Sequence, residues 1–455
     1  MSTLKVNKLR DTAGSTDAIT LDPNGGAVLA GVTTVSTVKV GSGVTISSDG
    51  DVFTTGITTS STVVVGSGVT ISESGIEASG IGITCANING TQIGGRRNII
   101  INGDMRIAQR GTSTTTSGGY AADRLNVFYS GTDEAPTFAQ ADVSSGTTPY
   151  TLGFRKCLKV TNGNQTSGAG AADYVWLQYK IEAQDIANSG WNYTSTSSFI
   201  TLSFWVKSSV AQDFKGWIQT YDGTGQSYPY ATGSLTADTW TKITKTIPGN
   251  SNLQFDNDAN TGLQIHFLPF FGTDYTASSA TENAWQAYSG TARCKDSTST
   301  WYTTNDATWE ITGLQLEVGS QATAFEHRSL GEELDLCTRY CQVFHTPNGT
   351  NRIANLQATV HGGGSGVYIT ANYKPMRAVP SVTTVGTIKG NVFTGSWTHS
   401  TLSSIAAEFI VDPLATAGFS GLISATSSEG SLTTGKTGFL YSDDSGGSII
   451  VHSEL

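Results

Sequence analysis

Charged residues are sparse in this chain, and several kinds of functional motif are missing from it. Only 14% of the 455 residues are Asp, Glu, Lys or Arg. The five cysteines form no CxxC pair, which argues against both a disulfide framework and a zinc site. There is no GxSxG elbow, no HExxH sequence and no Walker loop. The sequence therefore predicts no cofactor, no metal and no enzymatic activity.

Long hydrophobic runs and basic clusters are also missing. The first eight residues lack an apolar signal region, and no run of 18 apolar residues occurs anywhere. We therefore expect synthesis in the cytoplasm and no insertion into a membrane. Residues 1–110 carry eight basic and eight acidic residues, so the net charge of −10 lies beyond them. With no basic stripe to contact a phosphate backbone, nucleic acid is not an expected partner.

What the chain does contain is glycine, threonine and serine, together with a repeat near its start. The 53 glycines and the low charge are typical of an all-β protein with many tight turns. The segment 31–47 returns as 56–72, and each copy places two short alternating stretches around a Gly-Ser-Gly corner. This pattern predicts strand, corner and strand.

One copy of this repeat offers too few apolar side chains to fold alone, because ordering each residue costs about 1–2 kcal/mol. Stacked repeats usually number at least three before they are stable, and only two clear copies are present, with a degenerate third near residue 80. We therefore expect three chains to wind together into a shaft over residues 31–97. A small single-chain β meander is the alternative.

Beyond residue 97 the repeat disappears and aromatic residues become frequent. Loops rich in Gly, Asn, Asp, Ser and Thr separate the apolar stretches, without helices between them. This arrangement suits an antiparallel two-sheet sandwich of the jelly-roll kind over residues 98–329. The expected strands are 157–160, 174–181, 199–206, 216–221, 240–247, 262–267 and 308–316.

Residues 330–346 show the one helical pattern, with Leu330, Leu334, Cys337, Cys341 and Phe344 at helical spacing and acidic residues in the first turns. We expect a short linking helix there, with the cysteines as small packing residues. Alternating apolar residues from 347 to 455 then predict another β domain.

Several phrases of the sequence resemble a known group. The phrases 98–111, 122–124, 204–208, 240–242 and 311–319 with 324–328 are similar to the central domain of tail fibre proteins of marine tailed phages, especially those of cyanobacteria. The strand phrases also resemble jelly-roll carbohydrate-binding modules. The opening 2–7, the repeats, the Cys337–Cys341 phrase and the ending 449–455 extend the likeness over most of the chain. Leu125 departs from it, because the family pattern more often has Trp there.

The resemblance implies a homotrimeric phage tail fibre in the virion that attaches the particle to a host bacterial surface polysaccharide. Residues 1–30 would attach to a phage tail or adaptor protein, and the shaft would follow. The two β domains, of which residues 347–455 resemble the distal β-sandwich of such fibres, would meet the receptor. Loops on a rigid sheet are where recognition usually resides, so either the middle or the distal domain is a candidate. The rival functions are a tailspike depolymerase that cleaves the polysaccharide and a structural fibre without a ligand.

Strand alternation indicates where sugar-binding groups would lie. Sugars stack on aromatic faces while polar groups fix their hydroxyls. In the expected strands, Trp176, Gln178, Trp205 and His266 lie opposite the apolar residues, and they would form one glycan platform if those faces belong to one sheet. The alternative is packing against the other sheet or a neighbouring subunit. The oxygen-rich segment 256–260 is a calcium candidate, although a solvated turn explains it as well.

Overall fold

The chain divides into two compact units, residues 1–85 and 86–455. The computed structural model describes residues 97–345, 373–393 and 447–455, together with strands in the remaining parts. Side chains are described chiefly for residues 97–345, 373–389, 435–440 and 447–455. The other residues lie outside the description.

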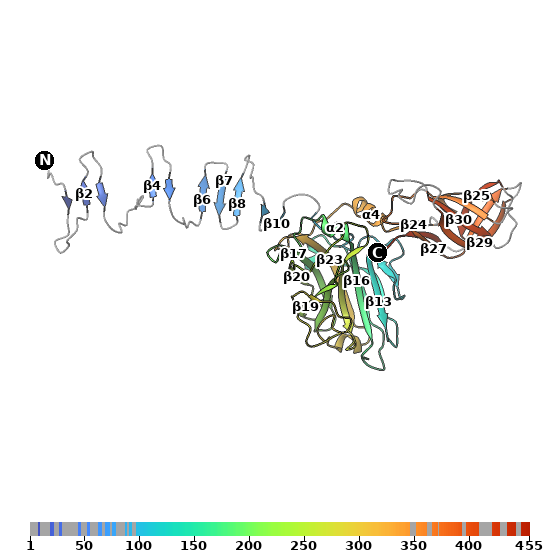
Figure 1. Cartoon of the computed structure of the whole chain (residues 1–455), viewed down its shortest axis with the longest axis horizontal. Helices are drawn as coiled ribbons and strands as arrows, with labels where there is room; N and C mark the ends of the chain where they lie inside the picture. The colour runs from blue at the N-terminus through green and yellow to red at the C-terminus, as the bar shows by residue number, and fades with distance from the viewer. Residues whose placement is uncertain are drawn as a thin grey trace. The chain divides into compact units, whose positions relative to one another are not determined.

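Short antiparallel strands are described in the N-terminal region (Figure 1). In the second repeat copy, the two expected strands are present and pair antiparallel, while the Gly66-Ser67-Gly68 stretch between them lies outside the described residues. In the first copy the stretch around Val38 lies outside the described residues, and the strand after the corner pairs with the strand that follows it. The trimer stays a prediction. The strands are β1 (Lys8–Leu9), β2 (Ile19–Leu21), β3 (Ala27–Leu29), β4 (Val44–Ile46), β5 (Val52–Thr54), β6 (Thr62–Val65), β7 (Val69–Ser72), β8 (Gly75–Ala78), β9 (Asn87–Ile88) and β10 (Thr91–Gln92).

Two antiparallel sheets form the middle domain, so the predicted sandwich is confirmed (Figure 1). The six-stranded sheet has the order β11 (Ser113–Thr114), β14 (Thr137–Asp142), β15 (Lys156–Thr161), β23 (Thr308–Val318), β17 (Phe199–Ser208) and β20 (Thr241–Pro248). The seven-stranded sheet has the order β12 (Tyr120–Ala122), β13 (Leu125–Ser130), β16 (Tyr174–Glu182), β21 (Thr261–Phe271), β18 (Asp213–Thr220), β19 (Gln226–Ser234) and β22 (Gln286–Ala287). All seven expected strands are present.

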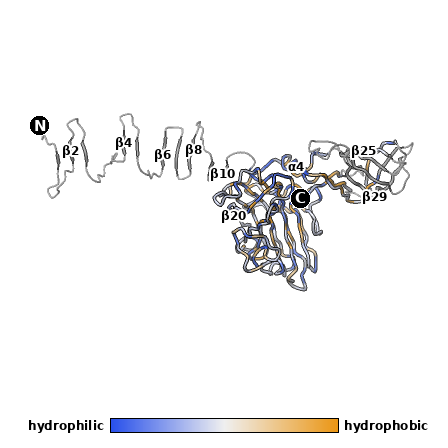
Figure 2. Tube along the Cα trace, viewed as in Figure 1, coloured by the Kyte–Doolittle hydropathy of each residue, from blue (hydrophilic) through white to orange (hydrophobic). Residues whose placement is uncertain are grey.

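The core lies between the two sheets and is built by strand alternation, which Figure 2 shows as apolar and polar residues following one another along the strands. Leu177 and Ile265 from the seven-stranded sheet meet Phe204 and Ile311 from the six-stranded sheet, and all four are fully buried. Fully burying such a side chain contributes roughly 1.5–3 kcal/mol. The apolar face of each strand thereby determines which residues are left on the outer faces.

The helices are short: α1 (Thr148–Thr151), α2 (Ala183–Ala187), α3 (Thr300–Thr303) and α4 (Leu330–Thr338). A capping box between Ser329 and Glu332 begins α4. The expected helix over 330–346 is too long, because Cys341–His345 form strand β24. Leu330 and Leu334 are exposed, so the apolar residues at helical spacing do not all lie on a buried face of the helix. The four described cysteines are free and buried, as packing residues would be.

The described residues after 346 are β as expected, but where a second sandwich was expected the strands close into a barrel in the order β25, β26, β30, β29, β28 and β31. A separate three-stranded sheet has the order β24, β32 and β27. The bounds are β25 (Arg352–His361), β26 (Gly366–Ala371), β27 (Ser381–Val385), β28 (Ile388–Phe393), β29 (Trp397–Glu408), β30 (Gly421–Ser427), β31 (Thr437–Ser442) and β32 (Ser448–His452). Closure pairs both edge strands, which two open sheets would leave unpaired.

Residues after β32 join this region to the sandwich through buried ion pairs. Glu454 lies 2.6 Å from Arg110 and 2.5 Å from Arg124. Burial opposes ionisation of Glu454, but Arg124 and Arg110 overcome it and lower the pKa of the carboxyl. If residues 453–455 moved away, Arg110 and Arg124 would be left as buried charges without their partner, which is strongly destabilising. These contacts therefore fix the 453–455 segment on the sandwich. Among the described residues, no helix is long and apolar enough to cross a membrane.

Candidate functional site

The outer face of the seven-stranded sheet carries most of the residues that alternation selected. Val175, Leu177 and Tyr179 of β16 enter the core, so Trp176, Gln178 and Lys180 point away from it. The register aligns neighbouring strands on the same side: Gln178 lies opposite His266 of β21, which lies opposite Trp217 of β18. We use "the outer face" for this set: Asn126, Phe128, Trp176, Gln178, Lys180, Trp217, Gln219, Ser227, Gln264 and His266.

Four rings stack across the outer face. The centroids of Phe128 and Trp176 are 4.9 Å apart. His266 lies 4.9 Å from Trp176 and 3.8 Å from Trp217, with an angle of 10° between the last two rings. Phe128 and Trp176 are half-buried, whereas Trp217 is 1% exposed. The stack therefore presents Phe128 and Trp176 to solvent and supports them from one side with buried rings.

A row of amides runs beside the ring stack. Gln178 donates to the Oε1 atom of Gln264 at 2.5 Å, and the Tyr221 hydroxyl donates to the same oxygen at 2.8 Å. Trp217 donates to Gln219 at 3.3 Å. Burial raises the pKa of Tyr221 to about 12, so its hydroxyl stays a donor at neutral pH. Side-chain amides and hydroxyls of this kind can both donate to and accept from sugar hydroxyls.

His266 does not meet solvent, which corrects its expected role as a ligand contact. Its side chain is 1% exposed and lies between two indoles. Burial, with the positive charges of Arg293 and Lys180, lowers the pKa of His266 well below its ordinary value. A neutral, flat ring in this place holds Trp176 in position. Gln178 is also largely buried, so Trp176 is the most accessible of the three predicted residues here.

Trp205 belongs to the other sheet, so the four predicted residues do not form one platform. It lies in β17 of the six-stranded sheet, opposite Lys242 of β20. The alternation of apolar and polar residues correctly predicts which side chains of a strand face away from the core. It does not predict which sheet the strand joins. Phe128 was missed for a different reason, whereas Tyr221 ended the expected strand 216–221 and was not singled out. The strand 125–130 was not recognised, although Leu125, Val127 and Tyr129 alternate there with Asn126 and Phe128.

Polar atoms without partners gather on the outer face and the loop beside it. Thirteen buried side-chain polar atoms lack a hydrogen-bond partner among the described residues. Six of them belong to Asn126, Trp176, Ser227, His266 and Arg293. The Arg293 guanidinium lies 5.7 Å from the Trp217 ring. Unsatisfied buried groups cost about 1–3 kcal/mol each and are usually explained by function or by ordered water.

Metal candidates do not stand out in the part of the chain that the structure describes. Within it, no three His, Cys, Asp or Glu side chains cluster as metal ligands. In the calcium candidate 256–260, the Asp258 carboxylate accepts from the Asn260 backbone at 2.9 Å and from its amide at 2.6 Å. These oxygens are used within the turn, as in the solvated-turn explanation.

No family model matches the chain, and no curated protein matches it. Among solved structures, it is similar to the enzymatically active domain of tailspike protein 4 of bacteriophage CBA120, at TM-score 0.26 and 11% identity over 49% of this chain and 21% of that chain. It is also similar to the tandem CBM22 domains of Paenibacillus barcinonensis Xyn10C, at TM-score 0.25 and 12% identity over 82% of this chain and 100% of that chain. A third is the N-terminal cellulose-binding domain of Cellulomonas fimi β-1,4-glucanase C, at TM-score 0.23 and 13% identity over 47% and 97%.

The matched region spans about a fifth of the tailspike structure's length. The structural neighbours thus include a phage tailspike domain and carbohydrate-binding modules. The function of this chain is inferred below from its own residues.

Proposed function

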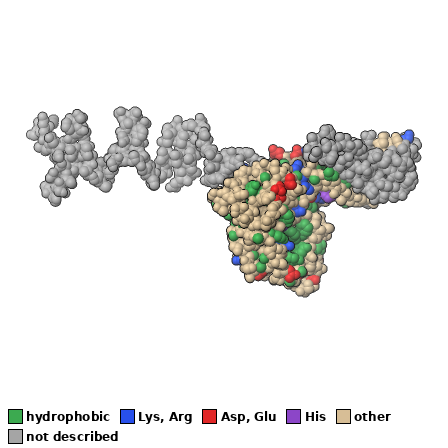
Figure 3. Space-filling model, viewed as in Figure 1, with side chains coloured by type: hydrophobic (Ala, Val, Ile, Leu, Met, Phe, Trp, Pro, Cys, Tyr) green, Lys and Arg blue, Asp and Glu red, His purple; other side chains and the backbone are tan. Residues whose placement is uncertain are grey.

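We propose that this protein is a phage tail fibre adhesin that binds a bacterial surface polysaccharide across the outer face of its seven-stranded sheet. The single observation that carries the proposal is the half-buried Phe128 and Trp176 stack beside the amides of Gln178 and Gln264. The two rings provide the stacking surface, and the buried Gln178 and Gln264 hold Tyr221, whose side chain is 46% exposed and offers an accessible hydroxyl beside it. Figure 3 shows the visible face of the sandwich as mostly uncharged, which suits a polyhydroxylated ligand.

The chemistry of the outer face supports binding without cleavage. Its ten residues include one cation, Lys180, and none of them carries a carboxylate. Glycoside hydrolysis ordinarily needs two carboxyl groups on either side of one bond. A depolymerase acting at this face would therefore need acidic residues from elsewhere in the protein.

The fibre and trimer parts of the proposal are supported by the N-terminal sequence. The strands β6 and β7 on either side of Gly66-Ser67-Gly68 have only three and two apolar residues, and such short repeats require partners to bury them. Three copies would align three sandwiches on one particle. Linked sites raise avidity by an effective concentration, without new contacts. Residues 1–30 would attach the shaft to a tail protein of the virion, and a marine, cyanophage-like phage is the proposed source.

The decisive experiment is a binding assay with purified full-length protein and polysaccharide extracted from the surface of a susceptible bacterium. Trp176→Ala should weaken binding at least tenfold, because it removes the exposed stacking ring. Trp285→Ala is the matched control, a half-buried tryptophan that packs against Tyr228 and the core between the sheets, away from both proposed sites. Equal binding by the wild type and Trp176→Ala, with both variants folded by circular dichroism, would refute this use of the face.

Two further measurements address the rival functions. Incubating the protein with the same polysaccharide and measuring reducing ends tests cleavage. Sustained release that one carboxylate substitution abolishes would establish a depolymerase. Light scattering tests the trimer, because a stable monomer of 47.7 kDa would contradict the proposed shaft.

A further inference from the structure

A second concave site lies on the opposite side of the sandwich, around Trp205. Its volume is about 270 Å³, and its walls come from the six-stranded sheet and from the segments before β15 and after β23. The side chains that matter for its chemistry are Trp205, Phe154, Phe325, His327, Lys242 and Ser203. Drug-sized ligands occupy pockets of roughly 300–1,000 Å³, so this one suits a single sugar ring with a substituent.

A β-bulge at Gly313 shapes the floor of the Trp205 pocket. In the pairing of β17 with β23, Ser203 lies opposite Gln315 but Trp205 lies opposite Thr312, so one extra residue is inserted. Gly313 has φ of +65°, and a Cβ atom there would approach Phe154 to 2.7 Å and Trp205 to 3.2 Å. The two rings therefore close over a position that only glycine fits. Bulges of this kind often lie next to functional sites, where they re-aim a side chain.

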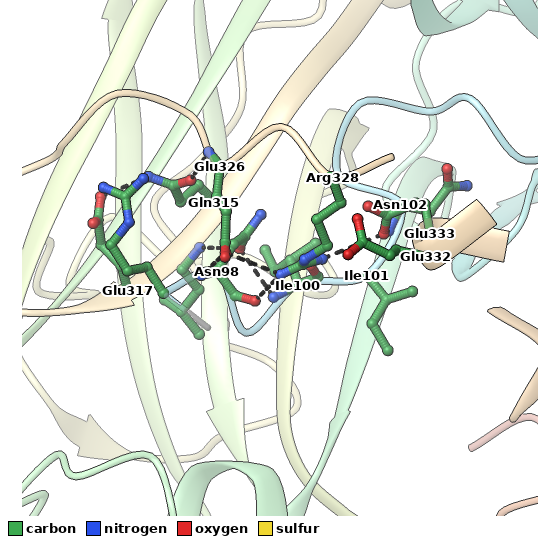
Figure 4. A network of polar contacts seen from close by, with 12 residues as sticks. Asn98, Ile100, Ile101, Asn102, Gln315, Glu317, Glu326, Arg328, Glu332 and Glu333 are labelled. Atoms are coloured by element: carbon green, nitrogen blue, oxygen red, sulfur yellow. Dashed lines mark hydrogen bonds and ion pairs between the residues drawn. The ribbon is translucent and has the colours of Figure 1, made fainter. Parts of the chain in front are cut away.

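The wall formed by residues 322–328 is held by a polar network, shown in Figure 4. The Glu317 carboxylate accepts from the Thr323 backbone at 2.8 Å and from Gln315 at 2.8 Å. Gln315 in turn accepts from the Glu326 backbone at 2.8 Å. Arg328 donates to the Ile100 carbonyl at 3.1 Å and pairs with the Glu326 carboxylate at 3.1 Å. The wall is thus fixed without a ligand, and its carboxylates are already engaged.

The remaining polar groups of the pocket favour an anionic ligand. Lys242 is exposed at the rim, and no hydrogen bond or ion pair to its ammonium group occurs within the described part of the chain. The residues lining the pocket include no acidic side chain. His327 Nε2 lies 2.8 Å from the Leu152 carbonyl, so it donates there and leaves Nδ1 to accept from a hydroxyl.

We propose that the Trp205 pocket binds one carboxylated pyranose, such as a uronic acid unit of a polysaccharide. The ring would stack on Trp205 beside the Phe154 and Phe325 rings, which contact each other edge to face, with its carboxylate toward Lys242 and a hydroxyl toward His327. This site is separate from the outer face of the seven-stranded sheet. It gives the protein a means of recognising acidic sugars with an ammonium group that is free among the described residues, whereas Lys180 of the outer face donates to the Leu455 carbonyl.

The test uses the full-length protein with sodium glucuronate, glucose and sodium acetate as probes, followed by saturation-transfer NMR and calorimetry. Glucuronate should bind with a millimolar dissociation constant, glucose about fivefold more weakly, and acetate not at all. A fivefold difference in affinity corresponds to about 1 kcal/mol, which is the upper end of the free energy that one exposed ion pair contributes. Lys242→Gln should weaken glucuronate binding by the same factor, whereas Lys436→Gln, an exposed lysine away from the pocket, should not.

Trp205→Ala should abolish glucuronate binding. Because that substitution also removes packing, Ala324→Trp provides a second variant: Ala324 is exposed at the pocket rim, and a larger side chain there would fill the space without removing a contact. Trp176→Ala should leave glucuronate binding unchanged, which separates this site from the proposed polysaccharide face. The proposal is overturned if the wild type does not bind glucuronate at tens of millimolar, if acetate binds equally well, or if binding survives both pocket variants.

Discussion

The two outer faces of the sandwich use tryptophan in opposite ways. On the seven-stranded sheet, Trp176 and Trp217 belong to a continuous stack of rings. On the six-stranded sheet, the Gly313 bulge interrupts the pairing, and Trp205 lines a pocket. Both pairings shift register beside the tryptophan, between Val175 and Leu177 against β21 and between Ser203 and Trp205 against β23. The difference therefore comes from the neighbours: the rings of His266 and Trp217 lie beside Trp176, whereas Gly313 lies beside Trp205 and leaves space.

The largest expected effect is on stability, at the buried end of the ring stack. Trp217→Ala should lower the free energy of unfolding of the sandwich by roughly 3–5 kcal/mol, because it leaves a cavity among fully buried rings. Trp205→Ala should lower the free energy of unfolding by only about 1–2 kcal/mol, since that side chain is half-buried. Urea unfolding of the full-length protein, monitored by far-ultraviolet circular dichroism, provides the comparison. Equal losses would show that the two faces do not differ in packing.

A change of intermediate size is expected at the bulge. Gly313→Ala should lower the free energy of unfolding by about 2 kcal/mol. A left-handed backbone conformation is unfavourable by roughly 1–2 kcal/mol for a residue other than glycine, and the new methyl group would also meet Phe154. The same variant should lose glucuronate binding while retaining polysaccharide binding at the outer face. Gly190→Ala is the control, since φ there is +86° but nothing lies near the new methyl group. If both variants lose glucuronate binding equally, the effect is not local to the pocket.

The sequence predicted the strands of the sandwich better than it predicted the site. The alternation in 174–181 identified the outward position of Trp176 correctly, because apolar burial alone decides which side faces the core. It did not predict that Trp205 joins the other sheet, since sheet order depends on long-range pairing between β17 and β23. Nor did it predict the burial of His266, because the neighbouring Trp217 comes from a strand 40 or more residues away in the chain.

The helix beyond residue 329 illustrates the same limit. Leu330, Leu334 and Cys337 satisfied helical spacing, yet the helix ends at Thr338 and strand β24 begins at Cys341. Strand β24 pairs with β32, whose residues lie more than 100 positions later. A distant strand therefore overrides the local pattern from Cys341 onward. Local propensity is a weak prior wherever tertiary pairing is available.

The smallest predicted effect tests whether His266 is part of the buried stack. Its pKa in the folded protein is lowered by burial and by Arg293 and Lys180, while in the unfolded chain it stays near the ordinary value of about 6.5. Below that pH the unfolded state binds more protons than the folded state, so stability falls as the pH falls. The free energy of unfolding then falls by up to about 1.4 kcal/mol for each pH unit. It stops falling only below the pKa that His266 has in the folded protein.

His266→Gln should flatten this dependence between pH 6.5 and pH 5, as measured by urea unfolding at several pH values. The difference between the wild-type and variant slopes isolates the histidine, because carboxylates that titrate in the same range are present in both proteins. A variant with the wild-type slope would mean that His266 is protonated as readily in the fold as in the unfolded chain. The imidazole would then be hydrated, and the ring stack that distinguishes the seven-stranded face from the Trp205 pocket would be open at its centre.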